Sequence, residues 1–340
     1  MKPQVRRQKT VVPPCDNQGV KQELSVPMLM RRLTSEAAAY ELLEELRWNG
    51  HPVCPHCNSI DRATYLNPAN GVSRRTRTGA ASQRRVWKCR DCRRQFSVLT
   101  GTFFHGTKIS IRSWILVILE MCASKNGVSA REIERKYDLT AKTAWFMLHR
   151  IREAMKSGPL AAILSGTIAA DETYIGGKAH NKHGRGRTGG VPAWARKDNK
   201  TIVFSLVHRE SGTVRSAVVP DVTGATLRKV MADHVNMADS DLMTDEGLWY
   251  GPLGREFKTH ETVNHSAYEY GRGPVTTNHA EGYFSQLKRS LDGTHHHVSR
   301  EHLPRYLAQF DFLRSTHKLD DSERMRIVLE RAAGRRLTYK

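Results

Sequence analysis

The sequence predicts a mixed α/β protein, with a mixed sheet flanked by helices in the C-terminal half and a small metal-binding module plus a helical region before it. After Gly158, short apolar runs alternate with helix-spaced segments in the order strand, hairpin, helix, strand, helix. That order is typical of a layered α/β fold. In the N-terminal half, two Cys-x-x-Cys pairs precede two closely spaced amphipathic segments.

The composition narrows the class of protein. The 340 residues include 54 Lys and Arg against 34 Asp and Glu, a formal net charge of +20. This length predicts about two domains, and the basic balance favours a polyanionic partner, most often nucleic acid, with acidic proteins and lipid surfaces as alternatives. No apolar run approaches the roughly 18 residues of a membrane span, and no apolar region follows the basic start at 1–22. We therefore expect a cytoplasmic protein.

The N-terminal third divides into a tail, a helix and a basic block. Residues 1–27 are polar and basic and are expected to form a flexible tail. Residues 35–47 have apolar side chains at helical spacing, with Ser35 placed to cap the helix. Residues 51–110 carry many Arg and Lys and few acids, so we treat 28–110 as one module with a leading helix.

Four cysteines in this module form a candidate metal site. Cys54 and Cys57 form one pair, and Cys89 and Cys92 form the other. Four thiolates in two such pairs suit one structural Zn²⁺ ion with no ligand position left for water. Iron–sulfur ligation or unrelated buried cysteines are the alternatives. The 31 residues between the pairs (58–88) predict an inserted hairpin or loop.

Residues 111–160 are predicted to be helical, with a helix-turn-helix at 129–155. Thr140 is placed to cap the second helix. In a DNA-reading unit of this kind, side chains on or near the second helix face the nucleic acid, here Lys142, Thr143, Trp145 and Arg150. An ordinary α-hairpin that packs on the metal-binding module is the alternative.

The second half, 161–318, is predicted to contain the sheet. Its expected strands are 167–170, 201–208, 212–220 and 241–244, with a hairpin turn at 209–212 and helices at 225–237 and 278–291. The segment 175–200 is rich in Gly and cations and is expected to be a loop. Residues 319–340 are expected to form a basic tail with helical character.

Three acidic residues stand at informative places in this second half. Asp171 and Asp245 close predicted strands, and Glu281 lies on a predicted helix. Carboxylates that converge from separate elements can hold two divalent ions about 4 Å apart, the arrangement that promotes phosphodiester displacement. Taken singly, each acid is more often a surface charge or a helix cap.

The neighbours of these acids receive different interpretations. Glu172 and Glu246 follow Asp171 and Asp245 directly, so strand alternation points them to the other face and we assign them no role. Lys288 lies seven residues after Glu281 on the same helix face, where it could hold a DNA phosphate; a solvated lysine is the alternative.

At this point the sequence resembles the bacterial insertion-sequence transposases of the DDE superfamily, specifically the zinc-ribbon group called insertion-sequence family 1595 (ISXO type). The resemblance covers most of residues 34–315. The matching stretches are RWNGHPVCPHC, CRDCRRQFSVLTGTFFHGTKI, ADETYIGGK, TDEG and TTNHAEGYFSQLKRSLDGTHHHVSREHLPRYLAQFDF. One departure is the long basic spacer between the two cysteine pairs.

The resemblance implies an RNase H-like catalytic domain whose acidic set falls on Asp171, Asp245 and Glu281. It also implies cleavage at the ends of inverted repeats and strand transfer to a target, with two catalytic Mg²⁺ ions that Mn²⁺ can replace. Asn278 matches an Asn of the family motif and is a candidate ligand or orienting residue. Candidate DNA contacts are Lys178, Lys288, Arg289, Lys142, Arg150 and His296, while the roles of His265 and His295–His297 stay open.

The sequence thus predicts a DNA transposase that acts in the bacterial cytoplasm, in association with the nucleoid. Its partners would be the element ends and target DNA, and pairing two ends predicts a homodimer or a larger assembly. Two other classes remain: a zinc-ribbon and helix-turn-helix regulator without catalysis, and an RNase H-like nuclease that cuts without joining.

Overall fold

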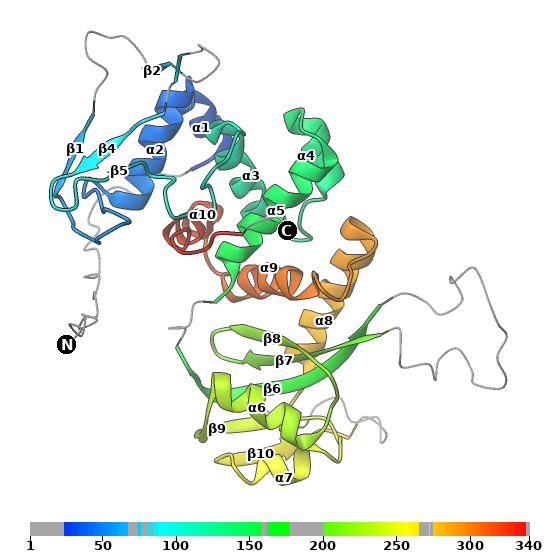
Figure 1. Cartoon of the computed structure of the whole chain (residues 1–340). Helices are drawn as coiled ribbons and strands as arrows, with labels where there is room; N and C mark the ends of the chain where they lie inside the picture. The colour runs from blue at the N-terminus through cyan, green and yellow to red at the C-terminus, as the bar shows by residue number, and fades with distance from the viewer. Residues whose placement is uncertain are drawn as a thin grey trace.

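The computed structural model describes residues 24–66, 74–75, 81–82, 84–157, 162–176, 200–264, 272 and 275–337. Figure 1 shows a ribbon and helical part built mainly from the N-terminal half, beside a sheet with helices on both faces. Among the helices of these residues, none has both the length and the hydropathy needed to cross a bilayer.

A small ribbon packs on the first long helix. Helix α1 (Val26–Arg32) precedes α2 (Glu36–Trp48), whose cap Ser35 accepts a hydrogen bond from the Ala38 amide at 3.1 Å, as predicted. Strands β1 (Ala63–Tyr65), β4 (Trp87–Cys89) and β5 (Gln95–Phe96) form a three-stranded sheet in the order β1-β4-β5. The spacer holds the expected hairpin, β2 (Arg74–Arg75) paired with β3 (Ala81–Ser82).

Four helices form a second layer. These are α3 (Ile111–Ala123), α4 (Ala130–Tyr137), α5 (Ala141–Met155) and, from the far end of the chain, α10 (Asp321–Glu330). Thr140 caps α5 as predicted, accepting from the Thr143 amide. Helix α10 contacts α2, α3 and α5, and its residues Met325, Val328 and Leu329 are fully buried. The C-terminal segment that we expected to be a tail is therefore part of this helical core.

The sheet is mixed, as predicted, with the order β10-β9-β6-β7-β8. Its strands are β6 (Leu164–Ile175), β7 (Thr201–His208), β8 (Val214–Val219), β9 (Val235–Thr244) and β10 (Thr259–Thr262). Strands β6, β7 and β8 are antiparallel neighbours, whereas β9 runs parallel to β6 and β10 runs parallel to β9. An antiparallel meander joined to parallel strands, with helices on both faces, is the RNase H-like architecture.

Helices cover the two faces of this sheet. Helices α6 (Gly224–His234) and α7 (Tyr250–Gly254) cover one face, and α8 (Asn278–Ser290) and α9 (Leu303–Ser315) cover the other, with a π-helical turn at Leu291–His295 between α8 and α9. Strand alternation separates the two cores: Ile168 and Ala170 pack towards α6, whereas Ala169 belongs to the core that α8 shares.

Some predicted elements differ from the structure in their bounds, and one strand was not predicted. Strand β6 continues to Ile175, five residues beyond the predicted end, because β7 supplies antiparallel partners for residues 171–175. The helix predicted over 225–237 ends at His234, and Val235 is already extended (φ −128°, ψ 136°) at the start of β9. Strand β10 was not predicted, because its four residues are mostly polar and form a strand only beside β9.

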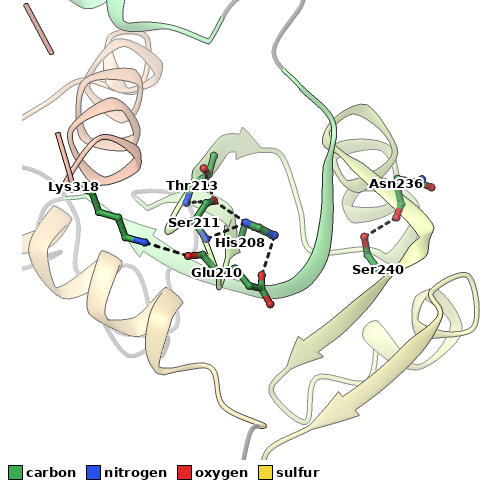
Figure 2. A network of polar contacts seen from close by, with 7 residues as sticks. All are labelled: His208, Glu210, Ser211, Thr213, Asn236, Ser240 and Lys318. Carbon is green, nitrogen blue, oxygen red and sulfur yellow. Dashed lines mark hydrogen bonds and ion pairs between the residues drawn. The ribbon is translucent and has the colours of Figure 1, made fainter. Parts of the chain in front are cut away.

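The β7–β8 hairpin is held by a local polar network (Figure 2). The His208 ring lies between the Glu210 carboxylate (Nε2 to Oε2, 2.9 Å) and the Ser211 hydroxyl (Nδ1 to Oγ, 2.7 Å). Ser211 donates in turn to the Thr213 hydroxyl at 2.7 Å, and Lys318 reaches the Glu210 carbonyl at 3.4 Å. These contacts order the turn and tie it to the segment after α9.

Candidate functional site

The strand register brings Asp171 and Asp245 to the same place in the sheet. Strands β6 and β9 are parallel neighbours, and their last recorded pair is Ala169 with Met243. Two residues further along each strand lead to Asp171 and Asp245, on the same side of the sheet as that pair because side chains alternate. The two carboxylates therefore project side by side from the point where the ladder ends.

Glu281 approaches this point from the helix above. It lies in the first turn of α8, which packs on β6 and β7 through Ala280, Phe284 and Leu287. Ala169 belongs to the same core, so Asp171, two residues on, also faces α8. The Thr277 hydroxyl donates to Glu281 Oε1 at 3.0 Å and fixes the carboxylate at the start of the helix.

The pKa of Asp171 reflects the charges of the neighbouring acids. The pKa of Asp171 is raised to about 7, mainly by burial. A hydrogen bond from the Glu172 amide lowers the pKa, and the charges of Glu172, Asp245 and Glu281 contribute to raising it. Like charges that disfavour each other's ionisation are relieved by a bound cation. The three acids lie on separate elements, each half-buried at the rim of the sheet.

These carboxylates fit divalent ions in chemistry and spread. Carboxylate oxygens are the ligands that Mg²⁺ prefers, and two ions about 4 Å apart require ligands spread more widely than a single closed cluster. Within the described ranges, the only group of three or more potential ligands whose atoms all lie within 4.8 Å of one another is the cysteine set. The acids are thus an open set, in contrast to the cysteines.

Glu172 and Tyr250 are the residues that sequence reasoning missed. Alternation correctly predicts that Glu172 faces away from Asp171, towards α7, but its side chain is half-buried there and accepts a hydrogen bond from the Tyr250 hydroxyl at 2.6 Å. Burial raises the pKa of Glu172, and the charge of Asp245 raises it further. An aromatic residue five positions after Asp245 was the only signal in the sequence, and periodicity alone does not single it out.

The remaining candidates near the acids lie on or beside α8. Asn278 is the exposed first residue of this helix, and Lys288 and Arg289 are exposed in its last turn. His296 is exposed just after the π-helical turn, in a left-handed conformation (φ 58°), with its Nδ1 3.1 Å from the Asp292 carbonyl oxygen. Lys178 and His265 lie outside the described residues.

The four cysteines converge as predicted. The sulfur atoms of Cys54 and Cys92 are 3.7 Å apart and those of Cys57 and Cys89 are 3.6 Å apart. Tetrahedral Zn²⁺ with Zn–S bonds of about 2.3 Å places sulfur atoms about 3.8 Å apart. The spacing fits one zinc ion held between the knuckle before β1 and the knuckle after β4.

The second helix of the helix-turn-helix is more deeply buried than we predicted. Lys142 is exposed near its start, but Arg150 is only 6% exposed and donates from Nη2 to the His105 carbonyl at 2.8 Å. Its guanidinium group also lies over the Trp114 ring, 5.3 Å from the centroid. The assignment of Arg150 to the DNA surface was wrong, because its guanidinium group is buried against the His105 carbonyl and the Trp114 ring of α3.

Comparison with known proteins finds a matching domain family for a segment in each half of the chain. Residues 163–314 match the ISXO2-like transposase domain, and residues 34–95 match the transposase zinc-ribbon domain of the same group. A protein of Halobacterium salinarum described as an uncharacterized protein in transposable element ISH50 is 26% identical over 311 residues, covering 90% of this chain and 99% of its own length.

Two solved assemblies are weakly similar. The pre-cleavage Mos1 transpososome is 10% identical, with 64% of this chain and 78% of that chain covered and a TM-score of 0.27. The simian T-cell lymphotropic virus intasome in complex with PP2A regulatory subunit B56 gamma is 13% identical, with 56% and 64% covered and a TM-score of 0.27. The RNase H-like fold is established here by the strand order.

The fold, the cysteine site and the two domain matches define a DNA transposase with a structural zinc ion. Within that class, both matched domains are those of insertion-sequence family 1595, the ISXO type.

Proposed function

We propose that this transposase cuts and joins DNA at a two-metal site held by Asp171, Asp245 and Glu281. The observation that carries the proposal is the β6–β9 register, which leads Asp171 and Asp245 to adjacent positions on the face that α8 covers. When bound there, Mg²⁺ or Mn²⁺ would activate the attacking oxygen and stabilise the leaving oxygen of a phosphodiester displacement.

The side chains around the acids would hold and orient DNA. Lys288 and Arg289 lie on the same helix as Glu281 and supply exposed positive charge for phosphates. Asn278, at the start of that helix, would orient a ligand or the DNA backbone. A water would attack the first phosphodiester, and the freed 3′ hydroxyl would then attack target DNA, so no Ser or Tyr nucleophile is required.

The N-terminal part would recognise the ends of the element. The zinc ribbon and the helix-turn-helix carry much of the positive charge, and Lys142 is exposed near the start of α5. Affinity that depends on phosphate contacts falls as salt rises. We place the division of the chain at about residues 28–110, 111–160 and 161–318, and pairing of two ends would require at least a homodimer on the DNA. The reaction would take place in the bacterial cytoplasm, at the nucleoid.

The test is cleavage of a labelled duplex that carries the element end, with Mg²⁺ or Mn²⁺. Asp245→Asn should lose at least about 100-fold of the nicking and joining rates because it removes a metal ligand, while DNA binding is retained. Asp241→Asn is the matched control, since it removes the same charge from β9, four residues before Asp245. Nicking without joining would favour a nuclease, and binding without cleavage in either metal would favour a regulator.

A further inference from the structure

Glu172 and Tyr250 form a buried polar contact between the two segments that carry the acids. Glu172 follows Asp171 on β6, and Tyr250 begins α7 just after Asp245. The Tyr250 hydroxyl donates to Glu172 Oε2 at 2.6 Å, and the tyrosine is fully buried.

Backbone hydrogen bonds extend this contact to both acids. At one end, the Glu172 amide donates to Asp171 Oδ1 at 2.7 Å. At the other end, the Tyr250 amide donates to the Gly247 carbonyl at 3.0 Å, and the Gly247 amide donates to Asp245 Oδ1 at 3.0 Å. A continuous path therefore runs from one carboxylate to the other through Glu172, Tyr250 and Gly247.

Gly247 is fitted to its place in this path. A Cβ atom at this position would lie 3.0 Å from Asp245 Oδ1 and 2.9 Å from the Trp249 ring. Such contacts are too short for a side chain unless the Asp245 or Trp249 side chain moves. The absence of a side chain at Gly247 lets the turn close against Asp245.

The path spans the interval between β6 and β9 beyond their last pair. The ladder between β6 and β9 ends at Ala169 with Met243, so it leads Asp171 and Asp245 to neighbouring positions but does not pair their backbones. A buried carboxylate also costs stability, and an apolar pair could fill the same volume without that cost. A role in fixing Asp171 relative to Asp245 explains why Glu172 and Tyr250 form a polar pair here.

We propose that Tyr250 and Glu172 are positioning residues, which hold Asp171 and Asp245 at the separation that divalent ions require. They act from behind the carboxylates, on the α7 face of the sheet, and touch neither DNA nor ions. This inference rests on the proposed two-metal site and adds the residues that set its geometry. Such outer-shell partners orient metal ligands and typically change metal affinity by about 10- to 100-fold.

The test measures Mn²⁺ binding to the full-length, zinc-loaded protein by the electron paramagnetic resonance signal of free Mn²⁺. Tyr250→Phe removes one hydroxyl and should weaken Mn²⁺ binding about 10- to 100-fold, and nicking should recover at high Mn²⁺. The matched control is Tyr137→Phe on α4, which removes another tyrosine hydroxyl that donates to a glutamate (Glu120 Oε1 on α3, 2.8 Å). This variant should leave Mn²⁺ binding unchanged.

Two variants at position 172 separate positioning from direct ligation. Glu172→Gln keeps an oxygen that accepts from Tyr250 and should bind Mn²⁺ within a few-fold of the wild type. Glu172→Ala should lose as much affinity as Tyr250→Phe, and the double variant should lose no more than either single variant, because both break one path. Thermal unfolding of every variant identifies any that fails to fold, and the Gln variant then carries the test.

The outcomes distinguish this inference from the proposed function. If the wild type binds Mn²⁺ in an Asp245-dependent way but Tyr250→Phe binds it equally well, the positioning role is overturned and the two-metal site stands. If Glu172→Gln loses as much affinity as Glu172→Ala, Glu172 is a ligand and the positioning role is also overturned. If the wild type shows no Asp245-dependent Mn²⁺ binding, the proposed function fails and this inference fails with it.

Discussion

Replacement of Asp311 by alanine should destabilise the sheet part of the protein. Asp311 lies on α9, and its half-buried carboxylate accepts from the Tyr283 hydroxyl at 2.6 Å, the Ser216 hydroxyl at 2.7 Å and the Ser216 amide at 2.9 Å. One side chain thus joins α9, α8 and β8. Asp311→Ala leaves all three donors without this acceptor.

The expected loss follows from counting those donors. Each buried donor left without a partner costs about 1–3 kcal/mol. Ser205 lies 2.8 Å from the Ser216 hydroxyl and offers a replacement partner. Burial raises the pKa of Asp311, so removing the carboxylate also relieves some burial cost. We therefore expect the free energy of unfolding to fall by about 2–4 kcal/mol.

The assay is urea denaturation at pH 7 followed by tryptophan fluorescence. With a slope of about 3 kcal/mol per M, the Asp311→Ala midpoint should fall by about 1 M. Asp311→Asn keeps an acceptor oxygen but faces one donor with an N–H group, so it should lose about 1–2 kcal/mol. Asp239→Ala removes an exposed aspartate bonded only to Asn236 among the recorded contacts and should change stability by less than about 0.5 kcal/mol. An Asp311→Ala protein as stable as the Asp239→Ala control would refute the reasoning.

The further predictions concern pH, DNA binding and the folding role of Arg150. Because the pKa of Asp171 is raised to about 7 and metal ligands bind as carboxylates, Mn²⁺ affinity should rise about tenfold per pH unit below 7 and level off above it; a flat profile from pH 5 to 8.5 would contradict this. The raised pKa has the opposite effect on the metal-free protein, which should lose stability as pH rises through 7. Lys142→Ala should weaken binding to the element end. It should also reduce the slope of the logarithm of the binding constant against the logarithm of the salt concentration by about 1. Arg150→Ala should instead lower the unfolding temperature, since the buried guanidinium donates to the His105 carbonyl. An Arg150→Ala protein with unchanged folding stability and a weaker salt dependence of DNA binding would show that Arg150 contacts DNA.

The parts of the molecule that the sequence predicted are those with local signals. Two Cys-x-x-Cys pairs sufficed to predict the cysteine site, because each knuckle is short and four thiolates that converge suit tetrahedral Zn²⁺. Ser35 and Thr140 were identified as caps because a capping hydroxyl needs only the next few amides. The β7–β8 hairpin was also found from its two β-rich runs and short turn.

The acids show where sequence and tertiary structure divide. The sequence predicted three candidate acids on separate elements, but only the β6–β9 pairing shows that Asp171 and Asp245 lead to one point. The sequence predicted a strand that closes at Asp171. The strand in fact continues to Ile175, because β7, about 30 residues further along the chain, pairs with residues 171–175. Pairing between distant segments leaves no periodic trace in either of them.

The sequence by itself determined the metal-binding cysteines and most of the secondary structure, because ligand spacing, caps and periodicity act over a few residues. It indicated the class of protein through its resemblance to a known family. Only the tertiary structure decided that Arg150 is buried, that α10 belongs to the N-terminal helical core, and that Tyr250 bonds Glu172. The physical reason is that burial depends on what packs against a residue. The α5 helix is covered by three helices, two of which come from more than 140 residues further along the chain.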